Sequence, residues 1–155
     1  MDNNNFDLEN IKACINFAID KEQEAVDFYM DLASKVTSQP IVDELVKIAD
    51  MEKGHKNKLM NINLATLIAA DKKEVEDLKI ANYTVDKAPS ADMTMQDLVN
   101  LAMHKELAAQ KLYADLANSV QDANVSALFN QLSNEEAEHK NYFERLWDDN
   151  IMKEN

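Results

Sequence analysis

The sequence predicts an all-α protein built as a four-helix bundle, in which two helical hairpins are joined by one long crossover. Three observations carry this prediction. The chain has one Gly and two Pro in 155 residues and is rich in residues that favour helices. Four long segments carry apolar residues at helical spacing. The connection between the second and third segments is much longer than the other two connections, as a bundle with one crossover requires.

The first hairpin is expected over about residues 6–62. Its first helix is predicted from about Phe6 to Lys35, because apolar residues recur there at spacings of three, four and seven. Its second helix begins near Ser38, a suitable N-cap residue ahead of Pro40 in the first turn. One face of this second helix carries Ile41, Leu45, Ile48, Glu52, His55 and Leu59.

The second hairpin is expected over about residues 94–150. Thr94 and Asp97 have the spacing of a capping box, which places the start of the third helix at this point. The fourth helix follows Asp122. The apolar residues of these two helices are Leu98, Leu101, Leu107 and Leu112 in the third, and Val125, Leu128, Phe129, Leu132, Tyr142, Phe143 and Leu146 in the fourth.

Length, net charge, the first residues and the cysteine count limit the class of protein. The length fits one domain over residues 1–155, and the crossover at about residues 63–93 has room for a short helix. A net charge of −13 argues against nucleic acid and anionic membranes as partners. The first residues do not resemble a signal peptide and the longest apolar stretch, residues 64–70, is too short to span a bilayer, so a cytoplasmic protein is expected. A single cysteine, Cys14, excludes an internal disulfide and is expected to lie in the core.

The two predicted hairpins form an internal repeat. Residues 16–57 align with residues 100–141 without a gap, at a constant offset of 84 residues. The identities in register include Ala18 with Ala102, Lys21 with Lys105, Glu22 with Glu106, Ala25 with Ala109, Tyr29 with Tyr113, Glu52 with Glu136, and His55 with His139. Each hairpin therefore supplies a Glu on its first helix and a Glu-x-x-His motif on its second helix.

The repeated glutamates and histidines predict a dinuclear metal centre. Residues i and i+3 share a helix face, so the carboxylate and imidazole of each motif can converge on one point. Two antiparallel hairpins related by a pseudo-twofold axis would bring four carboxylates and two imidazoles together in the bundle interior. Such a cluster demands protons or cations, because buried carboxylates repel one another. Two divalent ions satisfy it, and the mixed oxygen and nitrogen ligands suit iron, manganese or zinc.

Other interpretations of these residues stay open. The repeat is also compatible with coincidence or with a site that has decayed. Tyr29 and Tyr113 lie seven residues after Glu22 and Glu106, two turns along the same face. Their hydroxyl groups are in a position to hydrogen bond a carboxylate of the facing hairpin, and plain core packing is the alternative. His104 has no histidine counterpart in the repeat and is expected at the surface.

At this point the chain resembles the rubrerythrin family of the ferritin-like superfamily. The likeness extends over nearly the whole sequence and rests on "FAIDKEQEAVDFYMDLA", "MEKGHKNKL", "VEDLKIANYTVD", "LAMHKELAAQKLYADLA" and "NEEAEHKNYFERL". The resemblance implies a ferritin-like four-helix bundle, two iron ions per chain with manganese or zinc possible, and a homodimer. It also implies roles for eight residues: Glu22 and Glu106 as terminal ligands, Glu52 and Glu136 as bridging ligands, His55 and His139 as caps on one metal each, and Tyr29 and Tyr113 as hydrogen-bond donors to ligand carboxylates.

Two departures from the family pattern bear on activity. The four cysteines of the rubredoxin-like module are not present, so a separate electron donor, such as a rubredoxin-type protein, is expected. Peroxidase-type members carry a further glutamate one turn after the third-helix ligand, and here that position is Ala109, with Ala25 as its repeat counterpart. This alanine puts redox-linked ligand exchange in doubt.

Three functions follow as hypotheses. The leading one is a non-haem di-iron oxidoreductase, protective against oxidative stress, that reduces hydrogen peroxide or oxygen with electrons from an external carrier. Glu22, Glu52, Glu106 and Glu136 would carry the chemistry. The second is ferroxidase or iron handling without peroxidase turnover, and the third is a metal-binding structural bundle.

Overall fold

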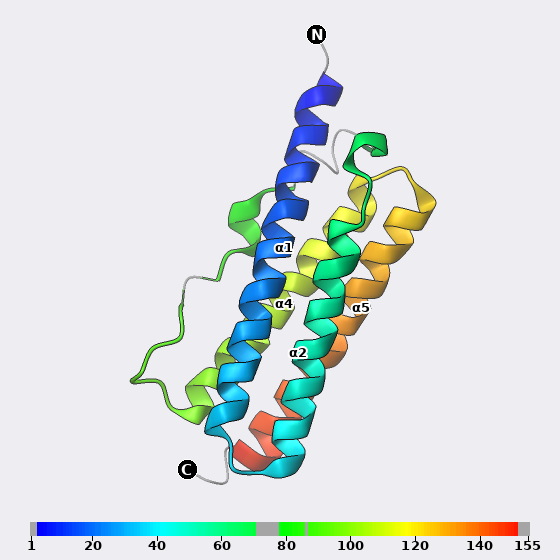
Figure 1. The fold of residues 1–155 in the computed structure, drawn as a ribbon. Coiled ribbons are helices and arrows are strands. Elements are labelled where there is room, and N and C mark those ends of the chain that lie inside the picture. Colours follow the sequence, from blue (N-terminus) through cyan, green and yellow to red (C-terminus); the bar gives the residue numbers. More distant parts are fainter. Residues whose placement is uncertain (1–2, 71–77, 86, 152–155) are drawn as a thin grey trace. The chain divides into compact units, whose positions relative to one another are not determined.

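Two helical hairpins account for most of the chain in the computed structural model, which describes residues 3–70, 78–85 and 87–151 (Figure 1). Contacts divide the chain into two compact units, Met1–Leu67 and Ile68–Asn155. The boundary falls inside the predicted crossover. Each unit contains one hairpin, and the prediction of a single domain stays a prediction.

The first unit consists of α1 (Asn3–Lys35) packed against α2 (Gln39–Met60). Ser38 is the N-cap of α2, as predicted, but its side chain makes no capping hydrogen bond with the described residues. Its backbone carbonyl accepts the first bond of the helix, from the amide of Val42 at 3.0 Å. Pro40 fits the first turn because its missing amide would have no helical partner there.

Apolar side chains of this unit fill a core at the predicted positions. The buried set includes Ile11, Cys14, Ile15, Ala18, Val26, Tyr29, Leu32, Leu45, Ile48 and Leu59. Burial raises the pKa of the Cys14 thiol to about 11, so the thiol stays protonated at neutral pH. On the outer side, the Lys56 ammonium donates to the side-chain oxygen of Gln23 at 2.9 Å, which links α2 to α1.

The second unit consists of α4 (Met95–Ser119) packed against α5 (Ala123–Leu146). The predicted capping box is confirmed: the Thr94 hydroxyl accepts from the Asp97 amide at 3.1 Å, and the Asp97 carboxylate accepts from the Thr94 amide at 3.0 Å. The Asp122 carboxylate caps α5 by accepting from the amides of Asn124 and Val125. A π-helical turn, η3 (Trp147–Ile151), follows α5.

Two serine hydroxyls of α5 hydrogen bond backbone carbonyls of α4. Ser126 donates to Ala117 at 2.7 Å and Ser133 donates to Gln110 at 2.9 Å. The core of the unit includes Leu98, Leu101, Ala102, Leu112, Tyr113, Leu116, Phe129, Leu132, Phe143 and Leu146. Leu107, one of the apolar residues in the sequence of α4, lies outside this core and is 50% exposed.

The described parts of the crossover contain two short 3-10 turns, η1 (Leu64–Thr66) in the first unit and η2 (Ile80–Tyr83) in the second. The Tyr83 hydroxyl donates to the Asp115 carboxylate of α4 at 2.7 Å. Residues 71–77 and 86, on which part of the predicted crossover helix falls, lie outside the described residues.

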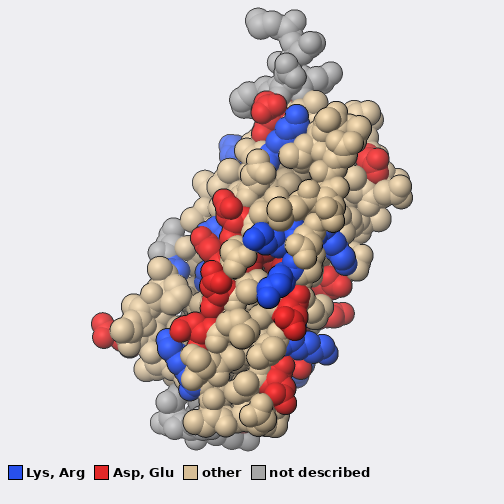
Figure 2. Space-filling view, in the orientation of Figure 1, with Lys and Arg blue, Asp and Glu red and all other residues tan. Residues whose placement is uncertain are grey.

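Charged side chains of both signs are interspersed on the face of the molecule in Figure 2. Neighbouring pairs on α1 include Lys21 with Glu24 at 2.9 Å and Lys35 with Asp31 at 3.0 Å. Such exposed pairs contribute little to stability, because water screens them. Among the described helices, none is long and apolar enough to cross a bilayer.

Candidate metal centre

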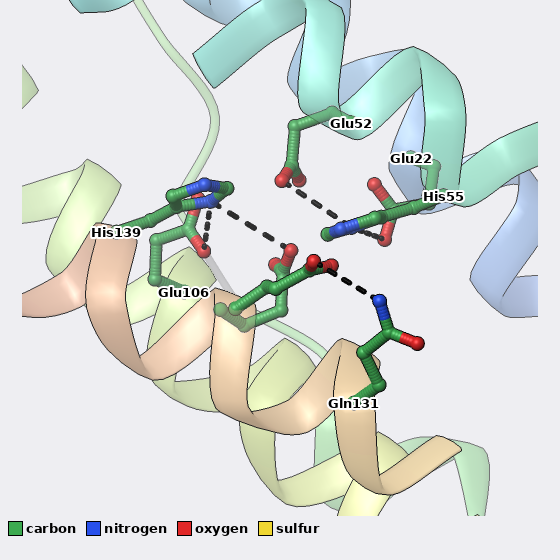
Figure 3. Close-up of polar contacts among 8 residues, drawn as sticks. Glu22, Glu52, His55, Glu106, Gln131 and His139 are labelled. Carbon is green, nitrogen blue, oxygen red and sulfur yellow. Dashed lines mark hydrogen bonds and ion pairs between the residues drawn. The ribbon is translucent and has the colours of Figure 1, made fainter. Parts of the chain in front are cut away.

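The first hairpin brings its three predicted ligands together. Glu22 comes from α1, and Glu52 and His55 come from one face of α2, three residues apart (Figure 3). The His55 Nδ1 atom lies 3.5 Å from a carboxylate oxygen of Glu22 and 3.5 Å from one of Glu52. All three residues are at most 3% exposed. We call this cluster the α1–α2 half-site.

The second hairpin repeats this arrangement with Glu106 from α4 and with Glu136 and His139 from α5. The His139 Nδ1 atom lies 3.6 Å from a carboxylate oxygen of Glu106 (Figure 3) and 3.8 Å from one of Glu136. Exposure of the three residues is 4% or less. We call this cluster the α4–α5 half-site, and its match to the first cluster agrees with the repeat in the sequence.

Both half-sites have the composition and spacing of a metal site. Within each of them, the ligand atoms that the two carboxylates and the imidazole offer lie within 4.8 Å of one another. Carboxylate oxygen with imidazole nitrogen is a ligand set for divalent iron, manganese or zinc. Two buried carboxylates in one cluster are expensive to keep charged unless a cation neutralises them. The residues therefore fit a bound metal.

The pKa of Glu22 is raised because its carboxyl group is buried beside another carboxylate. Burial and, next, the neighbouring charge of Glu52 raise the pKa of Glu22 from 4.5 to about 8, although His55 pulls it in the other direction. In the absence of a metal the carboxyl therefore holds a proton at neutral pH. A divalent cation is expected to displace that proton on binding.

The two repeated tyrosines, Tyr29 and Tyr113, are buried, and each lies seven residues after a predicted ligand. Tyr29 lies at 5.3 Å from Phe28, ring centre to ring centre, in an edge-to-face contact, and Tyr113 stacks on Phe129 at 6.4 Å. Both tyrosines are 1% exposed or less. Their predicted hydrogen bonds to ligand carboxylates stay predictions. His104 is exposed, as expected for a residue outside the repeat.

Two polar residues next to the α4–α5 half-site were missed from the sequence. Gln110 lies one turn after Glu106, and Ser133 lies one turn before Glu136. At the same positions of the first hairpin the repeat has Val26 and Ala49, which are both buried. Gln110 and Ser133 could have been found by comparing the two copies of the repeat, because each is a polar residue aligned with an apolar one.

The helices and half-sites define the class of protein: an all-α protein of the ferritin-like, four-helix kind, with clusters of glutamate and histidine that could hold a metal. A family model described as Rubrerythrin matches residues 4–63 and 69–155, so the chain belongs to the rubrerythrin family. A solved structure of a hypothetical protein from Pyrococcus furiosus shares the fold, with a TM-score of 0.67 and 20% identity over 89% of this chain and 88% of that chain. A search of curated proteins finds no match.

Proposed function

We propose that this protein is a non-haem di-iron oxidoreductase that reduces hydrogen peroxide or oxygen with electrons from an external carrier. The observation that supports this proposal most is the pair of matching, buried Glu/Glu/His half-sites. Membership of the rubrerythrin family makes iron the favoured metal. In the proposal the two half-sites share a pair of ions.

The proposed roles follow the repeat. Glu22 and Glu106 would be terminal ligands, Glu52 and Glu136 would bridge the two metals, and His55 and His139 would each cap one metal. Tyr29 and Tyr113 would hold ligand carboxylates in place by hydrogen bonding. The four carboxylates would offset the added positive charge of oxidised ions, and the burial of the site would limit the escape of reactive products.

The reaction is balanced by two electrons and two protons for each peroxide. Two bound ferrous ions would supply one electron each for cleavage of the oxygen–oxygen bond and formation of two water molecules. A separate one-electron carrier, such as a rubredoxin-type protein, would return these electrons. We further propose that the protein acts as a homodimer.

The first experiment measures metal content on protein purified without oxygen, with absorption spectra before and after one equivalent of peroxide. About two irons per chain and a new near-ultraviolet ferric band would support the proposal. Glu136→Ala should abolish the peroxide response, because it removes a proposed bridging ligand. Glu138→Ala, which removes an exposed glutamate from the same helix, is the matched control and should respond normally. Zinc or no metal, with a silent spectrum, would sink the assignment.

Iron handling without catalytic turnover is the second candidate. It is favoured by Ala109, which stands one turn after Glu106 where peroxidase-type members have a further glutamate. Size-exclusion chromatography and steady-state assays separate the two. Oxidation of many equivalents of ferrous iron by a large assembly, without sustained peroxide turnover, would favour iron handling. A dimer that turns over peroxide with an external donor would favour the oxidoreductase.

A further inference from the structure

Gln110 is a half-buried polar residue of α4. It follows Glu106 by four residues, so the two residues lie on neighbouring turns of one helix face. Its counterpart in the first hairpin, Val26, is 6% exposed. The side-chain oxygen of Gln110 is buried, and it has no hydrogen-bond partner among the residues that the structure describes.

A second polar replacement meets Gln110 across the hairpin. The Ser133 hydroxyl donates to the backbone carbonyl of Gln110 at 2.9 Å, and the counterpart of Ser133 is the buried Ala49. Ser133 precedes Glu136 by three residues on α5. Where the first hairpin has two apolar residues, the second hairpin therefore has two adjoining polar ones, one turn from its metal ligands.

The direction of α4 leads us to expect the Gln110 amide on the side of the α4–α5 half-site. Side chains of an α-helix lean toward the helix N-terminus, which for Gln110 is the direction of Glu106, four residues earlier. The backbone carbonyl of Gln110 accepts from the Ser133 hydroxyl, which links α4 to α5 at this level.

A buried amide oxygen without a partner lowers stability, so its presence points to a donor other than the residues that the structure describes. A carbonyl oxygen only accepts hydrogen bonds, so this donor must carry a proton. A group that fits beside two carboxylates and an imidazole must also be small and polar. Water and hydrogen peroxide meet both conditions, and an anion without a proton, such as azide, does not.

We propose that the Gln110 amide oxygen accepts a hydrogen bond from water or hydrogen peroxide held beside the α4–α5 half-site. Binding of water does not depend on the proposed function, whereas binding of peroxide rests on it. The second hairpin then carries a residue that holds a small ligand, and the first hairpin, with Val26 at the corresponding position, does not.

The test compares Gln110→Val, which installs the residue of the first hairpin, with Ser133→Ala, which removes only the link between the helices. The zinc-loaded protein is used for crystallography because zinc undergoes no redox change. In the wild type, an ordered water is expected within hydrogen-bond distance of the Gln110 amide oxygen. That water should be missing in Gln110→Val and present in Ser133→Ala, with unchanged zinc content in all three proteins.

Two solution measurements complete the test. Without metal, Gln110→Val should leave the melting temperature unchanged or higher, because it replaces a buried polar group and its bound water with an apolar side chain. In the iron-loaded protein, the same variant should slow the single-turnover reaction with peroxide about fivefold to tenfold, the effect of one lost hydrogen bond. A merely structural residue would not combine undiminished stability with a slower reaction.

Several results would overturn the proposal. A protein donor on the Gln110 amide oxygen in the crystal, direct coordination of zinc by that oxygen, or a lower melting temperature in metal-free Gln110→Val would each do so. An unchanged peroxide rate in that variant would remove peroxide as the ligand. If wild-type protein fails to react with peroxide at all, the proposed function falls, while the water in the zinc-loaded crystal still decides the role of Gln110.

Discussion

Replacing Glu22 by Gln is expected to remove most of the pH dependence of stability that the α1–α2 half-site gives the metal-free protein. The glutamine side chain keeps the shape of the carboxyl and cannot ionise. Glu22 is 3% exposed, and burial together with the charge of Glu52 raises its pKa to about 8. The prediction concerns the protein without metal, in which no cation neutralises this cluster.

The sign and size follow from the two pKa values of Glu22. Below its ordinary pKa of 4.5 the carboxyl is protonated in both folded and unfolded chains, and the penalty is absent. Between 4.5 and about 8 the folded state keeps a proton that the unfolded state has released, so the free energy of unfolding falls as pH rises. Above that range the penalty is complete, at about 5 kcal/mol for the whole difference, since one pKa unit is about 1.4 kcal/mol.

Thermal unfolding by circular dichroism between pH 5 and pH 9, on chelator-treated protein, measures this effect. The melting temperature of the wild type should fall by of the order of 10 °C more than that of Glu22→Gln over this range. Glu24→Gln removes the same charge from an exposed site on α1 and should follow the wild type. Parallel curves for wild type and Glu22→Gln would refute the reasoning about the half-site.

Further predictions concern stability away from the ligands. Adding a methyl group at Gly54 meets no heavy atom of the described residues within 4 Å, so Gly54→Ala should raise the free energy of unfolding by about 0.5–1 kcal/mol in urea titrations; a loss would indicate a contact there. Thr94→Ala removes the hydroxyl that accepts from the Asp97 amide and should lower the free energy of unfolding by about 1 kcal/mol. No change would show that the cap is dispensable. Tyr83→Phe deletes the hydrogen bond to Asp115 and should also lower the free energy of unfolding by about 1 kcal/mol. The same free energy of unfolding for the wild type and Tyr83→Phe would argue against that bond in solution. Chelation should lower the melting temperature and excess divalent metal restore it, whereas unchanged curves would argue against a metal site.

Helix starts were predictable from sequence because capping chemistry is local. Thr94, Asp97 and Asp122 act on amides two or three residues away, so spacing alone identifies them. Ser38 shows the limit of this reasoning, since it stands at the N-cap without making the side-chain bond. Leu107 shows another limit: it is six residues after Leu101 and five before Leu112, which is not the spacing of one helix face.

The grouping of the glutamates and histidine in each half-site was predictable for a different reason. The three-residue spacing of Glu52 and His55 is local, and the repeat selected Glu136 among the acidic residues before His139. The pKa of Glu22 was not predictable, because it depends on burial and on the distance to groups of another helix. Hydrogen bonds such as Tyr83 to Asp115 join residues far apart in sequence and leave no local pattern.

The two hairpins agree in their ligands and differ in how their helices are linked. In the first, Lys56 and Gln23 form a side-chain bridge on the outer side, each next to a ligand in sequence. In the second, Leu107 replaces Gln23 and is exposed, and Ser133 instead bonds the backbone of α4 from within the core. Metal binding by each half-site would require the same donor residues from each hairpin, whereas either link is sufficient to fix two helices. The second hairpin has the buried Ser133 where the first has the buried Ala49, and the two half-sites are therefore expected to differ chemically.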